Sequence, residues 1–577
     1  MKWRSPKAFA AILLASTMLV AGCGSNGNNA ANSGNTGNTG NAGSNAEASA
    51  DTSPITFTFF GADASPNWNN MQDDVGKVIT EKTGVTIEAE FDVGAGGGEN
   101  KIALMAASGD VPDLIFAKGE LSKLVDAGLI VDLAPLIEEH APNLKKMFSE
   151  NMNRLKYSND DQAIYSIFTN GGVDQQYFDA GGGFEIQQRV LKELGYPKVR
   201  TVQDFENVLK QYVEKHPTTD GQPTIPLTLS ADDWRIMITV TNPAFLATGA
   251  PDDGEYYVDP ETYEAMLHYK RPEEKDYFRW LNHMYNVGLL DKDTFVQKED
   301  QYKAKIASGR VLGLIDQEWG YQDAENALKT AGKDEYTYAH FPVTLSEEYE
   351  VHSFQQAGVD GYGISITTAC KDPVRAIKFI DWLSSDEGQV LRNWGVEGKH
   401  YTIDENGQRV VPADIQERKV NDTTNFTKES GISQYRIFGA NYGDGVKDPS
   451  GNYYTTNFPE QIVAGYTEAE KETLKAYNAT TWKDLFPGED AFPAKDWGAL
   501  YNMPTPTDGD YQVIYQKTQD IVRKRIPEAV LAKEADFDKV YDAFLAELDK
   551  AGAKEMEAEY TELVKKRVEL FTGKKLQ

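Results

Sequence analysis

Cysteine is scarce in this chain. Only Cys23 and Cys370 occur among 577 residues. If Cys23 is covalently modified, no intrachain disulfide remains, so stability must come from the packing of apolar side chains. Cys370 lies in a turn that leads into a helix, and we expect a small, partly buried residue there rather than a reactive thiol.

Long hydrophobic runs are equally scarce. The one run, from Ala8 to Val20, is shorter than the roughly 20 apolar residues that a transmembrane helix needs. Basic residues precede it and Ala21-Gly22 follow it, which is typical of a cleaved signal peptide over residues 1–22. The segment Leu19-Val-Ala-Gly-Cys23 resembles a bacterial lipobox, which implies a lipidated Cys23. An ordinary secretory signal and an uncleaved anchor are the alternatives.

Apolar residues are almost missing from the segment after Cys23. Gly, Asn, Ser, Ala and Thr make up nearly all of residues 24–50, a composition that predicts a flexible tether. We therefore predict a lipidated cysteine and linker over residues 23–54. The lipid would hold the protein at the extracytoplasmic face of the bacterial cell membrane.

Positive charge is in deficit. Lys and Arg number 58 against 89 Asp and Glu, which gives a net charge of −31. Loss of the three cations in residues 1–22 would take the net charge to about −34. Such a field repels polyanions, so we expect no nucleic-acid partner and no bulk binding to anionic lipid.

Familiar catalytic motifs are absent. The sequence has no G-x-S-x-G elbow, Walker loop, H-E-x-x-H or C-x-x-C pair, so we predict no enzyme activity, no catalytic residues, no cofactor and no metal. A glycosidase needs only two carboxylates at a set separation. A lipid-anchored glycoside hydrolase or lyase therefore remains an alternative.

What the chain does contain is alternating strand and helix. Residues Ile55–Phe60 alternate as a strand does, Gly84 ends a helix before a second strand at Val85–Phe91, and Leu114–Phe116 reads as a short buried strand. The middle of the chain repeats this character, with an amphipathic stretch, two helices and a buried strand at Phe184–Leu194, Val202–Val213, Tyr277–Val287 and Arg310–Asp316. This pattern predicts an α/β fold with a largely parallel first sheet.

Three stretches, in order, resemble the extracellular solute-binding proteins of ATP-driven importers. This family includes the maltodextrin-binding protein and a long branch of oligosaccharide-binding lipoproteins. The stretches run from Met105 to Leu133, from Phe184 to Thr201, and from Gly361 to Gly388, and residues 395–401 look typical of the long branch. Beyond residue 401 we recognise little.

The resemblance implies a two-lobed fold of the periplasmic-binding-protein type with hinge-crossing strands. We assign residues 55–175 and 360–435 to lobe I, and residues 176–359 and 436–577 to lobe II. Two such lobes close around a ligand that both of them hold.

One departure from the long branch concerns calcium. Many members carry an acidic calcium loop after the helix that matches Val202–Val213, but residues 216–225 here contain one carboxylate. We predict no calcium at this place. The acidic run Asp404-Glu-Asn-Gly407 is interpreted as a turn.

Candidate ligand-binding residues are aromatic or charged and follow strands. Trp319 matches a sugar-stacking tryptophan of the maltodextrin binder, with a packed helix start as the alternative. Trp234 and Arg235 follow another strand, Trp68 could equally be a core anchor, and Lys118 and Glu120 could be a solvated pair. The full set is Asp63, Trp68, Lys118, Glu120, Trp234, Arg235, Trp319 and Tyr442. Trp280 and Trp382 lie on helical stripes and are assigned to cores.

The resemblance, together with the chain's many aromatic residues, predicts a substrate-binding lipoprotein that captures a solute. An oligosaccharide is the solute that we expect first. We expect a monomer whose partners are the small-molecule ligand, ABC permease subunits and, through its lipid, the membrane. A glycan-binding surface adhesin is a further alternative.

Overall fold

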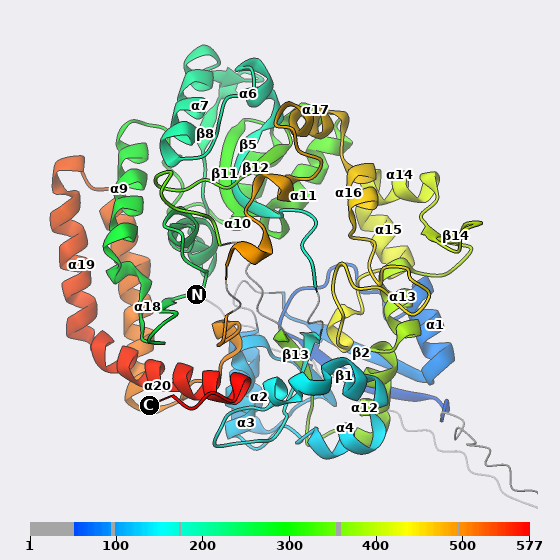
Figure 1. Ribbon diagram of the computed structural model, residues 1–577. Helices are drawn as coiled ribbons and strands as arrows, with labels where there is room; N and C mark the ends of the chain where they lie inside the picture. The colour runs from blue at the N-terminus through cyan, green and yellow to red at the C-terminus, as the bar shows by residue number, and fades with distance from the viewer. Residues whose placement is uncertain (1–50, 94–97, 172–174, 353–358, 493–494, 577) are drawn as a thin grey trace, which may run out of the picture. The chain divides into compact units, whose positions relative to one another are not determined.

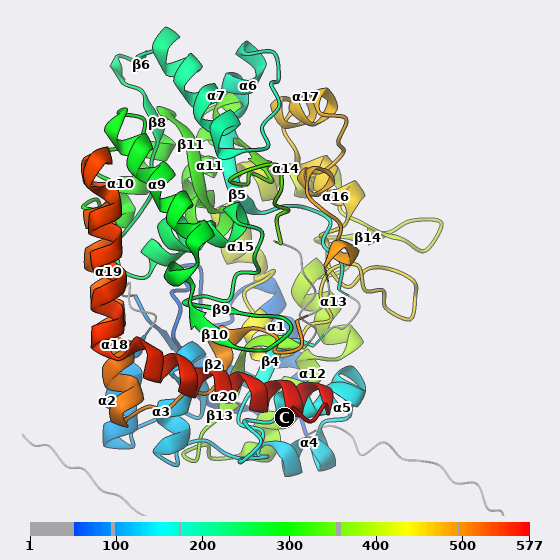
Figure 2. The same ribbon diagram turned by 60° about the vertical axis from the view of Figure 1, so that its left-hand side comes forward.

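The computed structural model describes residues 51–93, 98–171, 175–352, 359–492 and 495–576. The predicted signal peptide, Cys23 and residues 24–50 therefore lie outside the described residues. Figures 1 and 2 show the described part from two directions.

The first sheet has the order β2-β1-β3-β13-β4. Strand β1 pairs in parallel with β2 and β3, whereas β13 is antiparallel to both β3 and β4. The bounds are Ile55–Gly61 for β1, Val85–Phe91 for β2, Leu114–Phe116 for β3, Ile167–Asn170 for β4 and Asp360–Ile366 for β13. The predicted parallel first sheet is thus confirmed for the strands that the sequence revealed first.

Helices pack on this sheet through a core that contains Phe57, Leu114, Ile364 and Phe379. Local signals position them: the Asp73 carboxylate caps the first helix through Gly76 N–H, and Gly84 ends it with a φ of 70°. The helices grouped with this sheet are α1 (Asp74–Thr83), α2 (Glu99–Ser108), α3 (Leu121–Asp126), α4 (Ala134–His140), α5 (Pro142–Phe148), α12 (Pro373–Leu383) and α13 (Asp386–Trp394).

The second sheet has the order β12-β5-β11-β8, with β5 antiparallel to both of its neighbours. Its strands are β5 (Gly182–Gln187), β8 (Ile225–Leu227), β11 (Val311–Gln317) and β12 (Tyr338–Phe341). The amphipathic stretch Phe184–Leu194 contains the end of β5 and then helix α6 (Gln188–Glu193), which is the strand and helix that the resemblance implied.

A larger core surrounds the second sheet and includes Phe184, Leu312, Trp280 and Val568. The helices of this part are α7 (Val202–Lys215), α8 (Pro243–Ala247), α9 (Pro272–Asn286), α10 (Glu299–Ala307), α11 (Glu318–Thr330), α17 (Glu468–Ala476), α18 (Gly509–Val530), α19 (Phe537–Ala551) and α20 (Ala553–Thr572). Trp280 is buried in this core, as predicted, and Trp382 packs partly buried against the first core.

The chain passes between the two sheets more than once. It leaves the first sheet after β4 and enters the second at β5, and it returns from β12 to β13. Strands β4 and β13 are neighbours in one sheet, and β5 and β12 are neighbours in the other. The fold is therefore two-lobed, and the strands that flank the two crossings are neighbours in each sheet.

The region after residue 401 contributes to both lobes. Tyr435, Phe438 and Ala440 are buried in the first core, whereas Leu474, Trp482 and the helices α18 to α20 belong to the second. Short elements of low periodicity also occur between residues 402 and 465. They are β14 (Thr402–Ile403), β15 (Arg409–Val410), α14 (Ala413–Asn421), α15 (Thr423–Ser430) and α16 (Pro459–Gly465). Phe438 and Ala440 lie just beyond the expected boundary at residue 435.

Candidate functional site

Two tryptophans predicted as ligand-binding residues stand together. Trp319 is the second residue of α11, directly after β11, and Trp234 follows β8. Their ring centroids are 5.8 Å apart with an interplanar angle of 22°, and Trp319 remains 56% exposed. Side chains that are 85 positions apart in the sequence thus form one stacked aromatic surface with an open face.

Arg235 is buried beside this pair and does not share its exposed surface. Its guanidinium sits 5.2 Å from the centre of the Trp234 ring, and its Nη2 donates to Glu299 at 2.5 Å. The side chain is only 7% exposed. Although burial opposes the shift, hydrogen bonds from Lys303 and Arg235 lower the pKa of Glu299, so this carboxylate stays charged and holds the guanidinium under the ring.

A second group of predicted residues lies at the carboxyl ends of β1 and β3 in the first sheet. Lys118 Nζ lies 2.8 Å from Asp63 Oδ1 and 5.3 Å from the centre of the Tyr362 ring. Tyr362, on β13, has its ring 4.8 Å from that of Tyr501, which is 54% exposed. Glu120 pairs with Lys123 instead. An aromatic pair with a cation beside it can stack on and hydrogen-bond to a sugar ring.

Helix α18 connects the two groups. Arg523, on this helix, pairs with Asp233 at 3.0 Å, next to Trp234. Burial raises the pKa of Tyr515, also on α18, with the negative charge of Glu255 as the next cause and that of Glu120 as the smallest. Thr507, two residues before α18, donates a hydrogen bond to Asp126 of α3, so the start of this helix adjoins lobe I.

Two further predicted residues lie elsewhere. The Trp68 ring packs against Phe91, Tyr435 and Phe438 at centroid distances of 5.6, 5.5 and 6.0 Å, which favours its alternative role as a core anchor. Tyr442 stacks on Tyr454 at 4.9 Å, against the first core. The structure does not bring either ring to the stacked tryptophans.

Reasoning from the sequence missed Tyr362, Tyr501 and Tyr515. Tyr501 and Tyr515 lie beyond residue 401, where the resemblance fades, and their partners are far away in sequence. Tyr362 lies in one of the stretches that carry the resemblance, but it is flanked by glycines in a strand. Its aromatic side chain in an otherwise small-residue segment was the one available signal.

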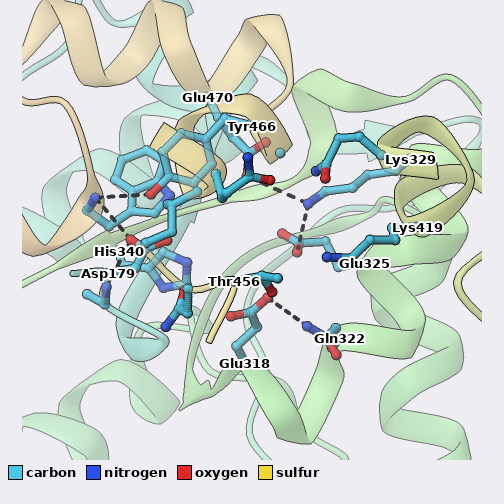
Figure 3. Close-up of a pocket in the computed structure, with 17 residues that line it drawn as sticks. Asp179, Glu318, Gln322, Glu325, Lys329, His340, Lys419, Thr456, Tyr466 and Glu470 are labelled. Atoms are coloured by element: carbon cyan, nitrogen blue, oxygen red, sulfur yellow. Dashed lines mark hydrogen bonds and ion pairs between the residues drawn. The ribbon is translucent and has the colours of Figure 1, made fainter. Parts of the chain in front are cut away.

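A polar cavity of about 380 Å³ lies along α11. One stripe of α11 lines it with Glu318, Gln322, Glu325 and Lys329, which Figure 3 labels. Residues of α14, α16 and α17 complete the lining. Burial, reinforced by the charge of Glu318, raises the pKa of Asp179 in this cavity to about 7. Burial beside Lys329 lowers the pKa of His340 to about 3, so its ring is neutral.

The segment expected to lack calcium forms a hairpin. Strands β6 (Thr218–Thr219) and β7 (Gln222–Pro223) flank Asp220 and Gly221, both at positive φ, and Asp220 pairs with Lys333 at 2.9 Å. Asp404 accepts from the backbone of Asn406 and Gln408 between β14 and β15, which confirms the predicted turn. Within the described residues, no cluster of three or more His, Cys, Asp or Glu side chains is arranged to hold a metal ion.

The described residues include no helix with the length and apolarity needed to cross a membrane. Two α/β lobes joined by more than one crossing of the chain, with aromatic and charged side chains after the strands of both, define a binding protein of the hinged type. Residues 75–393 match the family model of bacterial extracellular solute-binding proteins. Because the match covers more than half of the chain, the chain belongs to this family and is a solute-binding protein.

Curated relatives agree with this assignment. Lipoprotein LipO of Bacillus subtilis is 23% identical over 70% of this chain and 75% of its own length. The fructooligosaccharide ABC transporter substrate-binding protein FusA of Streptococcus pneumoniae is 24% identical, over 51% of this chain and 54% of its own length.

Solved structures share the fold. FusA in complex with kestose gives a TM-score of 0.64 at 17% identity, covering 90% of this chain and 100% of that one. A solute-binding protein associated with a human-milk-oligosaccharide-binding ABC transporter from Bifidobacterium longum infantis gives the same score, identity and coverage. The predicted two-lobed binding-protein fold is confirmed.

Proposed function

We propose that this protein captures an oligosaccharide between its two lobes and delivers it to the permease of an ABC importer. The observation that carries the proposal is the stacked pair of Trp234 and Trp319, whose outer ring is exposed directly after β11. Exposed aromatic faces match the C–H faces of sugar rings, and the neighbouring charged and phenolic groups can bond to hydroxyls.

The names of the relatives support the same proposal. FusA is named for fructooligosaccharides, and LipO is named a lipoprotein. We further propose that Cys23 is lipidated, so that a monomer works at the extracytoplasmic face of the membrane beside its permease and the associated ATPase. Asp63, Lys118 and Glu120 are proposed to contact ligand from lobe I. Arg235 is proposed to act through Trp234.

The test is a titration of intrinsic tryptophan fluorescence with a panel of trisaccharides: kestose, maltotriose, cellotriose, xylotriose and chitotriose. A ligand that covers Trp319 should change the emission and saturate. Mixtures held overnight should contain no new reducing ends, because a binding protein leaves its ligand intact. Newly formed reducing ends would instead support the glycoside hydrolase alternative, and no response to any sugar would contradict the proposed ligand class.

A further inference from the structure

The region after residue 401 builds most of the wall of the polar cavity beside α11. Gln416 and Lys419 come from α14, and Gln461 and Gly465 come from α16. Tyr466 lies just before α17, and Glu470 lies in α17 itself. The facing wall is the stripe of α11 that begins at Glu318. Since Trp319 is the next residue, the cavity starts one residue from the stacked tryptophans.

The cavity contains hydrogen-bonding groups that the protein leaves unused. His340 is 6% exposed, and within the described residues its Nδ1 makes no hydrogen bond, the nearest acid being Glu185 at 3.5 Å. The Oε1 atom of Gln416 has no partner among the described residues either. A buried polar group without a partner is costly, so the wall of this cavity is not fully satisfied by the protein's own contacts.

The charges in the cavity select the kind of ligand. Lys329 lies 3.6 Å from Glu325 and 3.7 Å from Glu470, so its charge is shared between two carboxylates. Glu318 adds further negative charge, the carboxyl of Asp179, with its pKa of about 7, is only partly ionised at neutral pH, and Lys419 is the remaining cation. An anionic sugar would be repelled, whereas hydroxyl groups can donate to carboxylates and accept from amides.

From these observations we infer that the cavity is an end-recognising subsite, which receives one terminal, neutral sugar residue of the bound oligosaccharide. This inference rests on the proposed function. A volume of about 380 Å³ is at the small end of ligand sites and suits one sugar ring rather than a chain. The region after residue 401 thereby determines which end of the oligosaccharide the protein binds in this subsite.

Gly465 offers a way to fill the cavity. A Cβ at this position would meet only Gln416 Nε2, at 3.6 Å, which is ordinary contact. The variant Gly465→Leu therefore adds a side chain to the cavity, and Ile462→Trp does so from the same helix. Ala464→Leu is the matched control, because residue 464 is exposed and does not line the cavity.

The experiment measures the affinity of wild type and variants for a trisaccharide that binds wild type in the panel above, and for the two disaccharides made by removing either end. In wild type, loss of one end should weaken binding at least tenfold more than loss of the other. In Gly465→Leu the trisaccharide should bind at least tenfold more weakly than in wild type, and Ala464→Leu should bind normally.

Unchanged trisaccharide affinity in Gly465→Leu or, if that variant does not fold, in Ile462→Trp would overturn the inference and leave the proposed function standing. Failure of wild type to bind any sugar of the panel would instead contradict the proposed function. If an acidic trisaccharide with a terminal uronic acid binds wild type more tightly than its neutral counterpart, the assignment to a neutral residue is overturned.

Discussion

Two tryptophans show at the residue scale what a sequence can and cannot reveal. Trp319 and Trp68 both follow strands, and both were candidates for the ligand site. In the structure Trp319 exposes a face, whereas Trp68 packs among three aromatic rings. The burial of Trp68 depends on Tyr435 and Phe438, which lie more than 360 positions later in the sequence. No local pattern around Trp68 could therefore predict it.

These two residues form a matched pair for mutation. Trp319→Ala should weaken sugar binding at least tenfold, because it removes the exposed stacking face, and should shift the melting temperature by less than about 2 °C. Trp68→Ala should lower the free energy of unfolding by about 3 kcal/mol, because it leaves a cavity in the core. Calorimetric titration and thermal melts separate the outcomes. A melting temperature that collapses in Trp319→Ala would show that this ring is structural.

Asp179 should make stability depend on pH. Its pKa is raised from 3.8 to about 7, first by burial, with Glu318 as the nearby like charge. A raised carboxyl pKa stabilises the fold most below pH 3.8, and this contribution is lost as the pH rises through about 7. Asp316, at about 6, and Glu325, at about 7, act in the same direction.

Asp179→Asn removes the first of these contributions while an amide oxygen can still accept from Ala180 and Trp482. Between pH 5 and pH 8 the melting temperature of wild type should fall by several degrees more than that of the variant. Parallel curves for the two proteins across this range would contradict the assigned pKa.

At the scale of elements, the sequence predicts best where local signals are strong. The Asp73 and Gly84 caps define α1, and the capping box of Thr201 and Asp204 starts α7. Short elements between residues 402 and 465 were not foreseen, since they lack a repeating apolar pattern and are held by long-range contacts. The candidate ligand site shows the same difference between local signals and long-range contacts. Trp234 and Trp319 were found one by one, but Arg523 and Tyr515 of α18 were not.

The last turn of α20 is held by residues of the first lobe. Asn153, in the short helix η2 (Ser149–Leu155), donates to the carbonyl oxygens of Leu570 and Phe571 at 2.7 and 3.2 Å. Lys566 pairs with Asp160 at 2.9 Å nearby. Because Val564 and Val568 of α20 belong to the second core, these bonds join the two cores at the end of the chain.

Asn153→Ala should therefore loosen one end of α20 without altering its core. We expect faster amide exchange confined to about the last two turns of the helix, and a loss of stability of about 1 kcal/mol. Lys566→Ala is the comparison, because an exposed ion pair contributes little. Exchange that accelerates along the whole of α20, or in neither variant, would contradict a role for Asn153 as a local clamp.

On the scale of the whole molecule, the charge of −31 and the segment before residue 51 belong to one argument. A strongly acidic body stays dispersed and is not drawn to anionic lipid, so it needs a covalent attachment to remain near a membrane permease. Lipid on Cys23 and a Gly-, Asn- and Ser-rich linker would supply it. Tethering raises the effective concentration of the binding protein at its transporter without strengthening any contact.

Cys23→Ser tests this arrangement in the intact chain. The variant should incorporate no radiolabelled palmitate and should leave the membrane fraction, because the thiol that accepts the lipid is gone. The purified protein should bind sugar like wild type, since Cys23 precedes all residues assigned to the two lobes. Cells that carry the variant should take up the sugar more slowly at low concentrations, where capture near the permease limits the rate.

Cys370→Ser, at the buried second cysteine, is the matched control and should stay labelled and membrane-bound. Equal labelling of wild type and Cys23→Ser would contradict lipidation at this residue.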